Sequence, residues 1–519
     1  MSEPSQKNQV LSGLFWKFGE RILAQGVSFV VSMVLARLLA PSDYGIIAMV
    51  LIFISIADVF VSSGFATALI QKKDSDATDF STMFYCSLAV SVLIYAGLFL
   101  ASPVIAGFYR EPVLVIVLRV FALRIPLSVY NTIQHAYVSR HMLFRRFFFS
   151  TLFGTLASGV VGIAMAYAGC GVWALVAQYF SNTIMDTLVL AVTVPWRPRL
   201  LFSWKRAKGL MDYGSKILLA DLSGTFFMQL RSFVIGKVYT SADLAYYNKG
   251  LQLPSLITTN ISASVMAVLF PAISNEGGNT QRVKQISKRA LELMSYVMFP
   301  LLGGMAAVAE PMILFLFTEK WRACIPFVQL LCISSAIGLL STISLQSIKA
   351  IGRSDVVLRL EVIKKPVYVL FLLGGVLKGV IAIAVTMVLY EIYSMMINMI
   401  QLKKYVCYGI WEQFLDILPA AVMTAGMVAV VMWFPVPVTG VLWQLLCKVL
   451  LGVMVYAVES VVLRPRAYRY LLSLVKKKLG EKEHEYDAKD RLFHERWFLC
   501  HKGENQVPGK MDPQQQYEK

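Results

Sequence analysis

Long apolar segments recur along the whole chain and constrain its fold more than any other feature. A bilayer core about 30 Å thick takes about 20 apolar residues as a helix, whose backbone polar groups must be satisfied internally. Segments of this length lie near residues 14–39, 44–68, 81–108, 113–138, 147–168, 171–194, 213–239, 247–272, 288–317, 324–348, 356–377, 379–402, 413–434 and 438–463. With 57% hydrophobic and only 15% charged residues, the chain is expected to be an all-α polytopic membrane protein with about fourteen transmembrane helices, twelve or thirteen being the alternatives.

The net charge of +18 is distributed as in a membrane protein rather than a nucleic-acid-binding one. If the N-terminus lies in the cytoplasm, the basic pair Arg145 and Arg146, the basic residues at 197–208, and the pair Lys403 and Lys404 all fall in cytoplasmic loops. We therefore expect both termini to be cytoplasmic, membrane lipids to be partners, and no nucleic acid to be bound.

Two motifs 200 residues apart indicate an internal repeat. VLARLLAPSDYG (34–45) is matched by VIGKVYTSADLA (234–245), where Lys237 stands in the place of Arg37 and Asp243 in the place of Asp43. Both copies run from inside to outside, which predicts parallel repeats. We interpret Arg37 and Lys237 as helix-end residues that either reach lipid headgroups or cap a helix.

The polar connection at 196–216 divides the first twelve predicted helices into two groups of six. We therefore predict an N-terminal lobe at 1–205, a C-terminal lobe at 206–408, and two further helices at 409–464. Beyond these the apolar pattern stops, and residues 465–519 are expected to form a cytoplasmic, disordered tail.

Polar side chains follow one face of several predicted helices, at spacings of three or four residues. A charge at bilayer depth costs at least ~2.5 kcal/mol, so such residues should face a partner or a wet cavity. The candidate substrate-cavity residues are Arg21, Gln25, Arg124, Asn131, Gln178, Asn182, Thr225 and Gln229. The acids Asp58, Asp186 and Asp221 either neutralise the arginines or couple transport to an ion.

Several motifs resemble the polysaccharide-transporter branch of the MOP exporter superfamily, which includes bacterial exporters of lipopolysaccharide and teichuronic acid (Wzx-like flippases). They are VLARLLAPSDYG, DVFVSSGFATALIQKKD (58–74), VLFPAISN (268–275), FTEKWRACIPFVQLL (317–331) and IKAIGRSDVVLRL (348–360). The resemblance covers about residues 10–465. It implies two six-helix lobes in a V-shaped arrangement plus two C-terminal helices, in a bacterial cytoplasmic (inner) membrane.

The resemblance also implies a function. A flippase of this kind turns a polyprenyl-diphosphate-linked oligosaccharide from the inner to the outer leaflet by alternating access, and works with glycosyltransferases and a polymerase of the same pathway. Arg21 and Arg124 could bind the diphosphate, because guanidinium offers paired donors to phosphate oxygens. We expect no catalytic residues, no metal and no cofactor. The alternatives are a cation-coupled multidrug exporter of the same fold, a membrane-embedded oligosaccharide polymerase or ligase, and a scaffold for glycosyltransferases.

Overall fold

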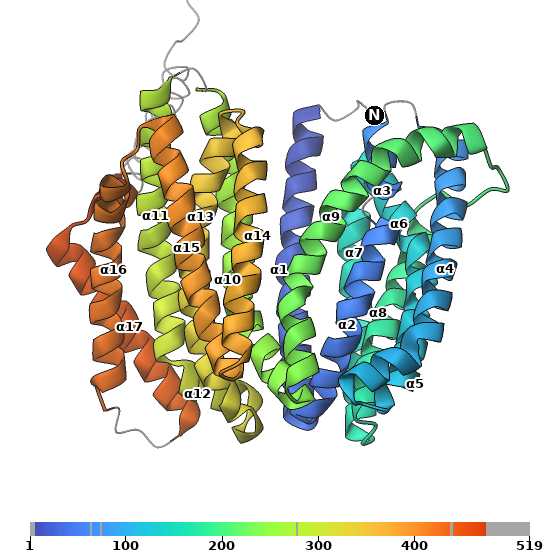
Figure 1. Ribbon diagram of the computed structural model, residues 1–519, viewed down its shortest axis with the longest axis horizontal. Helices are drawn as coiled ribbons and strands as arrows, with labels where there is room; N and C mark the ends of the chain where they lie inside the picture. Colours follow the sequence, from blue (N-terminus) through green and yellow to red (C-terminus); the bar gives the residue numbers. More distant parts are fainter. Residues whose placement is uncertain (1–5, 63–64, 73–74, 277–278, 436–439, 474–519) are drawn as a thin grey trace, which may run out of the picture. The chain divides into compact units, whose positions relative to one another are not determined.

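The computed structural model describes residues 6–62, 65–72, 75–276, 279–435 and 440–473. These residues fold into α-helices and one short 3₁₀ helix (Figure 1). The first eight helices are α1 (Gln6–Leu38), α2 (Pro41–Ser62), α3 (Phe65–Gln71), α4 (Ala77–Tyr109), α5 (Val113–Ala122), α6 (Arg124–Arg140), α7 (Phe144–Tyr167) and α8 (Val172–Thr193). There follow α9 (Trp204–Val238), α10 (Ser241–Ser274), α11 (Thr280–Ala307), α12 (Ala309–Phe317), η1 (Glu319–Cys324), α13 (Ile325–Ala350), α14 (Ser354–Val376), α15 (Val380–Val406), α16 (Ile410–Trp433) and α17 (Val441–Leu463).

Twelve helical spans in the described residues are long and apolar enough to cross a membrane. The predicted segments at 14–39 and 356–377 correspond to two helices outside this set. These are α1, whose apolar stretch among the described side chains is Leu23–Leu38, and α14, which carries Arg359, Lys364 and Lys365. The all-α, multi-pass fold is therefore confirmed, whereas the count of fourteen stays a prediction.

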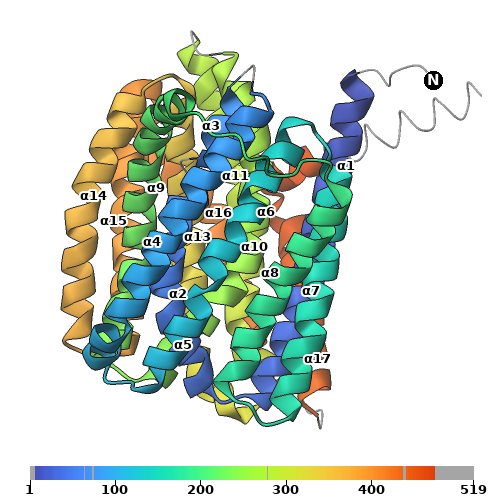
Figure 2. The ribbon, with the colours of Figure 1, turned by 90° about the vertical axis from the view of Figure 1, so that its right-hand side faces the viewer.

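The contacts divide the chain into Met1–Val455 and Tyr456–Lys519, and the description below concerns the first unit. In the N-terminal bundle (α1–α8), α7 packs against α1 and α8, and α4 packs against α5 and α6. In the C-terminal bundle (α10–α15), α13 packs against α10, α11 and α15, and α14 lies beside α15 (Figure 2). Helix α9 contacts α2 and α4 as well as α10 and α14. The predicted lobe boundaries stay predictions, and residues 474–519 of the predicted tail lie outside the described residues.

The two copies of the repeated motif meet where α2 packs against α10. In both copies the aspartate accepts a hydrogen bond at the start of the helix, from the Ala40 amide to Asp43 and from the Thr240 amide to Asp243, each at 3.2 Å. Only glycine fits at position 45, because a Cβ there would lie 1.9 Å from the carbonyl oxygen of Ser241. The first turns of α2 and α10 are thus in backbone contact.

Arg37 caps a helix of the C-terminal bundle, and Lys237 of α9 caps a helix of the N-terminal bundle. Arg37 donates from Nε to the carbonyl of Leu316 at 3.0 Å and also to that of Phe315, at the end of α12. Lys237 donates to the carbonyl of Phe108 at 2.6 Å, at the end of α4. A cation beside the last carbonyls of a helix is favourable, because those groups lack partners within the helix. Of the two predicted interpretations, the helix-capping one is confirmed.

Candidate functional site between the helical bundles

A cavity of about 490 Å³ lies between the two bundles, and we call it the interbundle cavity. Five helices line it: α1, α2 and α8 of the N-terminal bundle, α10 of the C-terminal bundle, and α9, which contacts both bundles. None of the described residues that line it is acidic, whereas two are cationic, Lys249 and Arg231. Its polar lining residues are Ser28, Ser32, Tyr44, Gln178, Tyr179, Gln229, Arg231, Ser232, Tyr247, Asn248, Lys249 and Gln252.

Lys249 is only 5% exposed and lies in a cage of aromatic rings. Its Nζ lies 4.7 Å from the ring centroid of Tyr44, 4.9 Å from that of Phe317 and 5.7 Å from that of Trp321. The ammonium group also donates a hydrogen bond of 2.7 Å to Ser32 Oγ. Ring faces stabilise a desolvated cation but leave its remaining donors available. Lys249 can therefore bind an anion that enters the cavity.

Arg231 lies on α9, with its guanidinium carbon 5.7 Å from the ring centroid of Tyr247. Its Nε is buried and has no hydrogen-bond acceptor among the described residues. A buried donor without an acceptor costs free energy unless a ligand supplies the acceptor. Glu391, which lies outside the cavity lining, interacts electrostatically with Arg231, so Lys249 is the less compensated cation of the two.

A second cavity of about 440 Å³, the N-terminal pocket, lies inside the N-terminal bundle and is lined by α2, α3, α6 and α8. Asn131 donates to Asp186 Oδ2 at 3.0 Å, and His135 Nε2 lies 3.5 Å from the same oxygen. Arg124 donates from Nε to Thr183 Oγ1 at 2.9 Å and interacts electrostatically with Asp58. The cation in this pocket is therefore balanced by nearby carboxylates.

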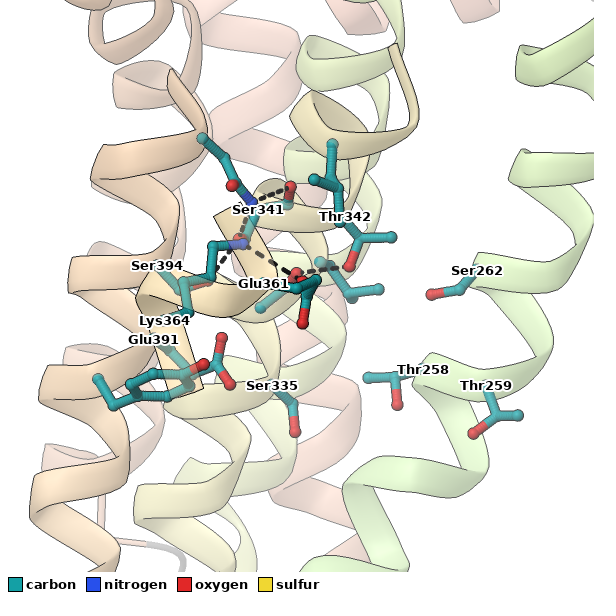
Figure 3. Close-up of a pocket in the computed structure, with 15 residues that line it drawn as sticks. Thr258, Thr259, Ser262, Ser335, Ser341, Thr342, Glu361, Lys364, Glu391 and Ser394 are labelled. Atoms are coloured by element: carbon teal, nitrogen blue, oxygen red, sulfur yellow. Dashed lines mark hydrogen bonds and ion pairs between the residues drawn. The ribbon is translucent and has the colours of Figure 1, made fainter. Parts of the chain in front are cut away.

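The corresponding C-terminal pocket, of about 420 Å³, lies among α10, α13, α14 and α15. Lys364 is buried and its Nζ lies 3.8 Å from Glu361 Oε1, while Glu391 lines the same pocket. Figure 3 shows these three side chains on one side of the pocket, with Thr258 and Ser262 of α10 on the other. Two carboxylates and one ammonium give this pocket a net negative charge, so it does not favour an anion.

The structure brings most of the predicted site residues together, but in two places. Asp58, Arg124, Asn131, Asn182 and Asp186 line the N-terminal pocket. The glutamines lie between the bundles. Gln178 and Gln229 line the interbundle cavity, and Gln25 accepts a hydrogen bond of 2.7 Å from Asn260 of α10.

Three predicted residues lie elsewhere. Thr225 lines none of the three cavities. Asp221 is exposed on α9 and forms no ion pair with a described side chain. Arg21 belongs to α1, but its side chain lies outside the described part of the chain. The roles assigned to all these residues stay predictions.

Lys249 and Arg231 were not among the predicted site residues, which were chosen for their spacing of three or four residues along polar helix faces. A different signal was present. Lys249 is the only charged residue between positions 244 and 275, and Arg231 is one of two within the apolar stretch 217–236. A charge inside a membrane span is by itself a candidate functional residue.

The chain is similar in sequence to bacterial proteins named for polysaccharide biosynthesis. It is 24% identical over 331 residues to the succinoglycan biosynthesis transport protein ExoT of Rhizobium meliloti, covering 64% of this chain and 67% of that protein. It is 22% identical over 419 residues to the lipopolysaccharide biosynthesis protein WzxC of Escherichia coli, covering 79% of this chain and 84% of that protein.

Solved structures of the same fold include two kinds of transporter. The lipid II flippase MurJ in an inward closed conformation superposes with a TM-score of 0.69 at 15% identity, covering 89% of this chain and all of that one. An inward-facing multidrug MATE transporter of the MOP superfamily has a TM-score of 0.58 at 15% identity, covering 74% of this chain and 94% of that one. These similarities confirm the predicted fold class.

The family model described as "Polysaccharide biosynthesis protein" matches residues 34–326. The match includes both copies of the repeated motif and every residue that lines the interbundle cavity apart from Ser28 and Ser32. Because it spans more than half of the chain, the protein belongs to this family of polysaccharide biosynthesis proteins.

Proposed function

We propose that the protein is a flippase that moves a polyprenyl-diphosphate-linked oligosaccharide from the inner to the outer leaflet by alternating access. It does so in a bacterial cytoplasmic membrane, with both termini in the cytoplasm. Membrane glycosyltransferases would supply the substrate and a polymerase of the same pathway would consume it. The names of the sequence relatives and the fold shared with a lipid flippase support this proposal.

The observation that carries the proposal is the charge of the interbundle cavity. A diphosphate headgroup cannot cross hydrocarbon without a polar site that replaces its water. Lys249 and Arg231 supply positive charge in a cavity whose described lining holds no carboxylate. Neutral donors such as Gln178, Gln229 and Asn248 add hydrogen bonds for phosphate oxygens. The cavity therefore matches an anionic headgroup.

The same charge argues against the cation-coupled multidrug exporter. An organic cation that entered the interbundle cavity would meet two like charges, which disfavours its binding. The multidrug transporters of similar fold show the architecture of this chain, not its ligand.

Reconstituted vesicles test the proposal. Polyprenyl-diphosphate-linked glycans extracted from the host would be incorporated, and their appearance in the opposite leaflet measured with an impermeant probe of the glycan. Lys249→Met should lower the rate about tenfold or more, because a hydrogen bond to a charged group contributes roughly 1.5–3 kcal/mol. The matched control, Lys403→Met, removes an exposed charge far along the sequence and should leave the rate unchanged. Equal rates for wild type and Lys249→Met, or transport of ethidium in place of the glycolipid, would contradict the proposal.

A further inference from the structure

The N-terminal pocket contains hydrogen-bond acceptors that have no donor among the described residues. Asn131 is 8% exposed, and its Oδ1 accepts no hydrogen bond from a described residue. Asp186 Oδ1 likewise accepts no hydrogen bond from a described residue, although Asp186 Oδ2 accepts one from the Asn131 amide group. Buried polar atoms are nearly always paired, so these two oxygens point to a ligand that supplies N–H or O–H donors.

The hydroxyl groups around the pocket add further acceptors. Ser62 and Thr132 donate to backbone carbonyls of their own helices, at 2.7 and 3.0 Å. Their oxygens can therefore still accept a hydrogen bond from a ligand. The Arg124 guanidinium and the Asn182 side chain complete a lining that is polar on three helices. Such a pocket suits a neutral molecule with many hydroxyl groups.

The charge of the pocket excludes a second anion site. Arg124 has the carboxylate of Asp58 close enough to interact electrostatically, and Asp186 lies across the same cavity. A phosphate group would meet two like charges and one opposite charge. The pocket thus differs from the interbundle cavity in the kind of ligand it can hold.

The two cavities follow each other along the same two helices. On α2, Leu51 lines the interbundle cavity and Asp58 the N-terminal pocket; on α8, Tyr179 lines the first and Asp186 the second. Each step is seven residues, or about 10 Å along a helix with a rise of about 1.5 Å per residue. Tyr179 belongs to the shared wall, since its ring centroid lies 5.7 Å from the Arg124 guanidinium carbon.

We propose that the N-terminal pocket binds the sugar residues next to the diphosphate and so selects the glycan. Hydroxyl groups of the sugar donate to Asn131 Oδ1 and Asp186 Oδ1, while the diphosphate occupies the interbundle cavity. A pocket of about 440 Å³ lies within the usual range for small-molecule sites. This inference rests on the proposed flippase function and assigns to this pocket a task separate from anion binding.

The test compares two ligands on the purified full-length protein. One is undecaprenyl diphosphate, and the other is the polyprenyl-diphosphate-linked glycan extracted from the host. The ratio of their dissociation constants isolates the contribution of the sugar. Wild type should bind the glycolipid at least about tenfold more tightly than undecaprenyl diphosphate. Asn131→Leu or Asp186→Asn should bring the ratio close to one, because each lost hydrogen bond weakens glycolipid binding about tenfold.

Matched variants distinguish the possible results. Ser150→Ala removes only a hydrogen bond to the backbone of Asp186, outside the pocket, and should leave the ratio unchanged. Asp58→Asn alters the pocket without affecting the Asn131–Asp186 hydrogen bond, and it should also lower the ratio. This variant keeps the test decisive if the other two fail to fold. Lys249→Met should weaken the binding of both ligands equally and so leave the ratio unchanged.

Three results would overturn the sugar site. The first is an unchanged ratio in folded Asn131, Asp186 and Asp58 variants. The second is a wild type that does not distinguish the two ligands. The third is ethidium binding that is lost in the pocket variants, which would identify a site for organic cations. If instead Lys249→Met binds undecaprenyl diphosphate as wild type does, the proposed function fails, whatever the ratio shows.

Discussion

The interbundle cavity and the N-terminal pocket are similar in volume and both contain an arginine, but their unpaired groups are opposite in kind. In the interbundle cavity a donor, Arg231 Nε, has no acceptor among the described residues, and the hydroxyls of Tyr44 and Tyr247, which can also donate, have no partner there. In the N-terminal pocket two acceptors, Asn131 Oδ1 and Asp186 Oδ1, have no donor there. The first cavity therefore needs a ligand rich in acceptors, such as a phosphate. The second needs one rich in donors, such as a sugar.

The comparison shows that an arginine on a polar helix face does not by itself indicate anion binding. Arg124 and Arg231 are both half-buried on membrane helices. What separates them is the lining of their cavities: carboxylates line the pocket around Arg124, whereas Glu391, the carboxylate that interacts with Arg231, lies outside the described lining of the interbundle cavity.

Removing both cations of the interbundle cavity should have the largest effect. Lys249→Met with Arg231→Met should lower glycolipid transport in vesicles about a hundredfold or more, because two charge-assisted hydrogen bonds are lost. The thermal midpoint of Lys249→Met alone should not fall, since replacing a buried charge by an apolar side chain removes its desolvation cost. Loss of transport together with unfolding would instead assign Lys249 a structural role.

Adding a carboxylate to the interbundle cavity should make it resemble the N-terminal pocket. Gln178→Glu is nearly isosteric and places a negative charge among the cations of the cavity. We expect glycolipid binding to weaken about tenfold, because one charge of the diphosphate now meets a like charge. The control Asn182→Asp adds the same charge one turn further along α8, in the N-terminal pocket. Asn182→Asp should leave the binding of undecaprenyl diphosphate unchanged. Equal weakening of that binding in both variants would show that the two cavities do not differ in anion binding.

Arg124→Ala should have a smaller effect. Transport should fall about three- to tenfold without unfolding, because Arg124 belongs to the proposed sugar pocket and not to the anion site. The loss leaves Asp58 without its cation, so Asp58→Asn in the same chain should raise the thermal midpoint again. A double variant no more stable than Arg124→Ala would show that the two side chains do not compensate each other.

The smallest effect is expected from a pair outside both cavities. Arg206 at the start of α9 contacts Asp76 at 2.6 Å, and this hydrogen bond lowers the pKa of Asp76 to about 2. A lowered carboxyl pKa contributes stability above about pH 4, which is lost as the pH falls toward 2. Arg206→Ala should therefore lower the thermal midpoint by at most about 2 °C, equally at pH 5 and pH 8. A shift that grows between pH 5 and pH 8 would contradict this assignment.

The sequence was informative wherever a pattern is local. Apolar length predicted the membrane helices, and polar spacing predicted residues of α2, α6 and α8 that now line one pocket. The repeated motif predicted that Arg37 and Lys237 lie at helix ends.

Features that depend on contacts between distant segments were not predictable in the same way. The aromatic cage of Lys249 draws Tyr44 from α2 and Trp321 from η1. The partners of Arg37 are backbone carbonyls, which leave no trace in residue identity. The assignment of side chains to one cavity or the other depends on how the helices pack. The sequence alone therefore could not predict that Arg124 and Lys249 line different cavities.

The most direct test of the account is the binding of undecaprenyl diphosphate, which carries no sugar, to wild type, Lys249→Met and Arg124→Ala under identical conditions. Lys249→Met should weaken binding about tenfold or more, whereas Arg124→Ala should bind as wild type does. Weakened binding in Arg124→Ala together with wild-type binding in Lys249→Met would place the anion site inside the N-terminal bundle and contradict the account.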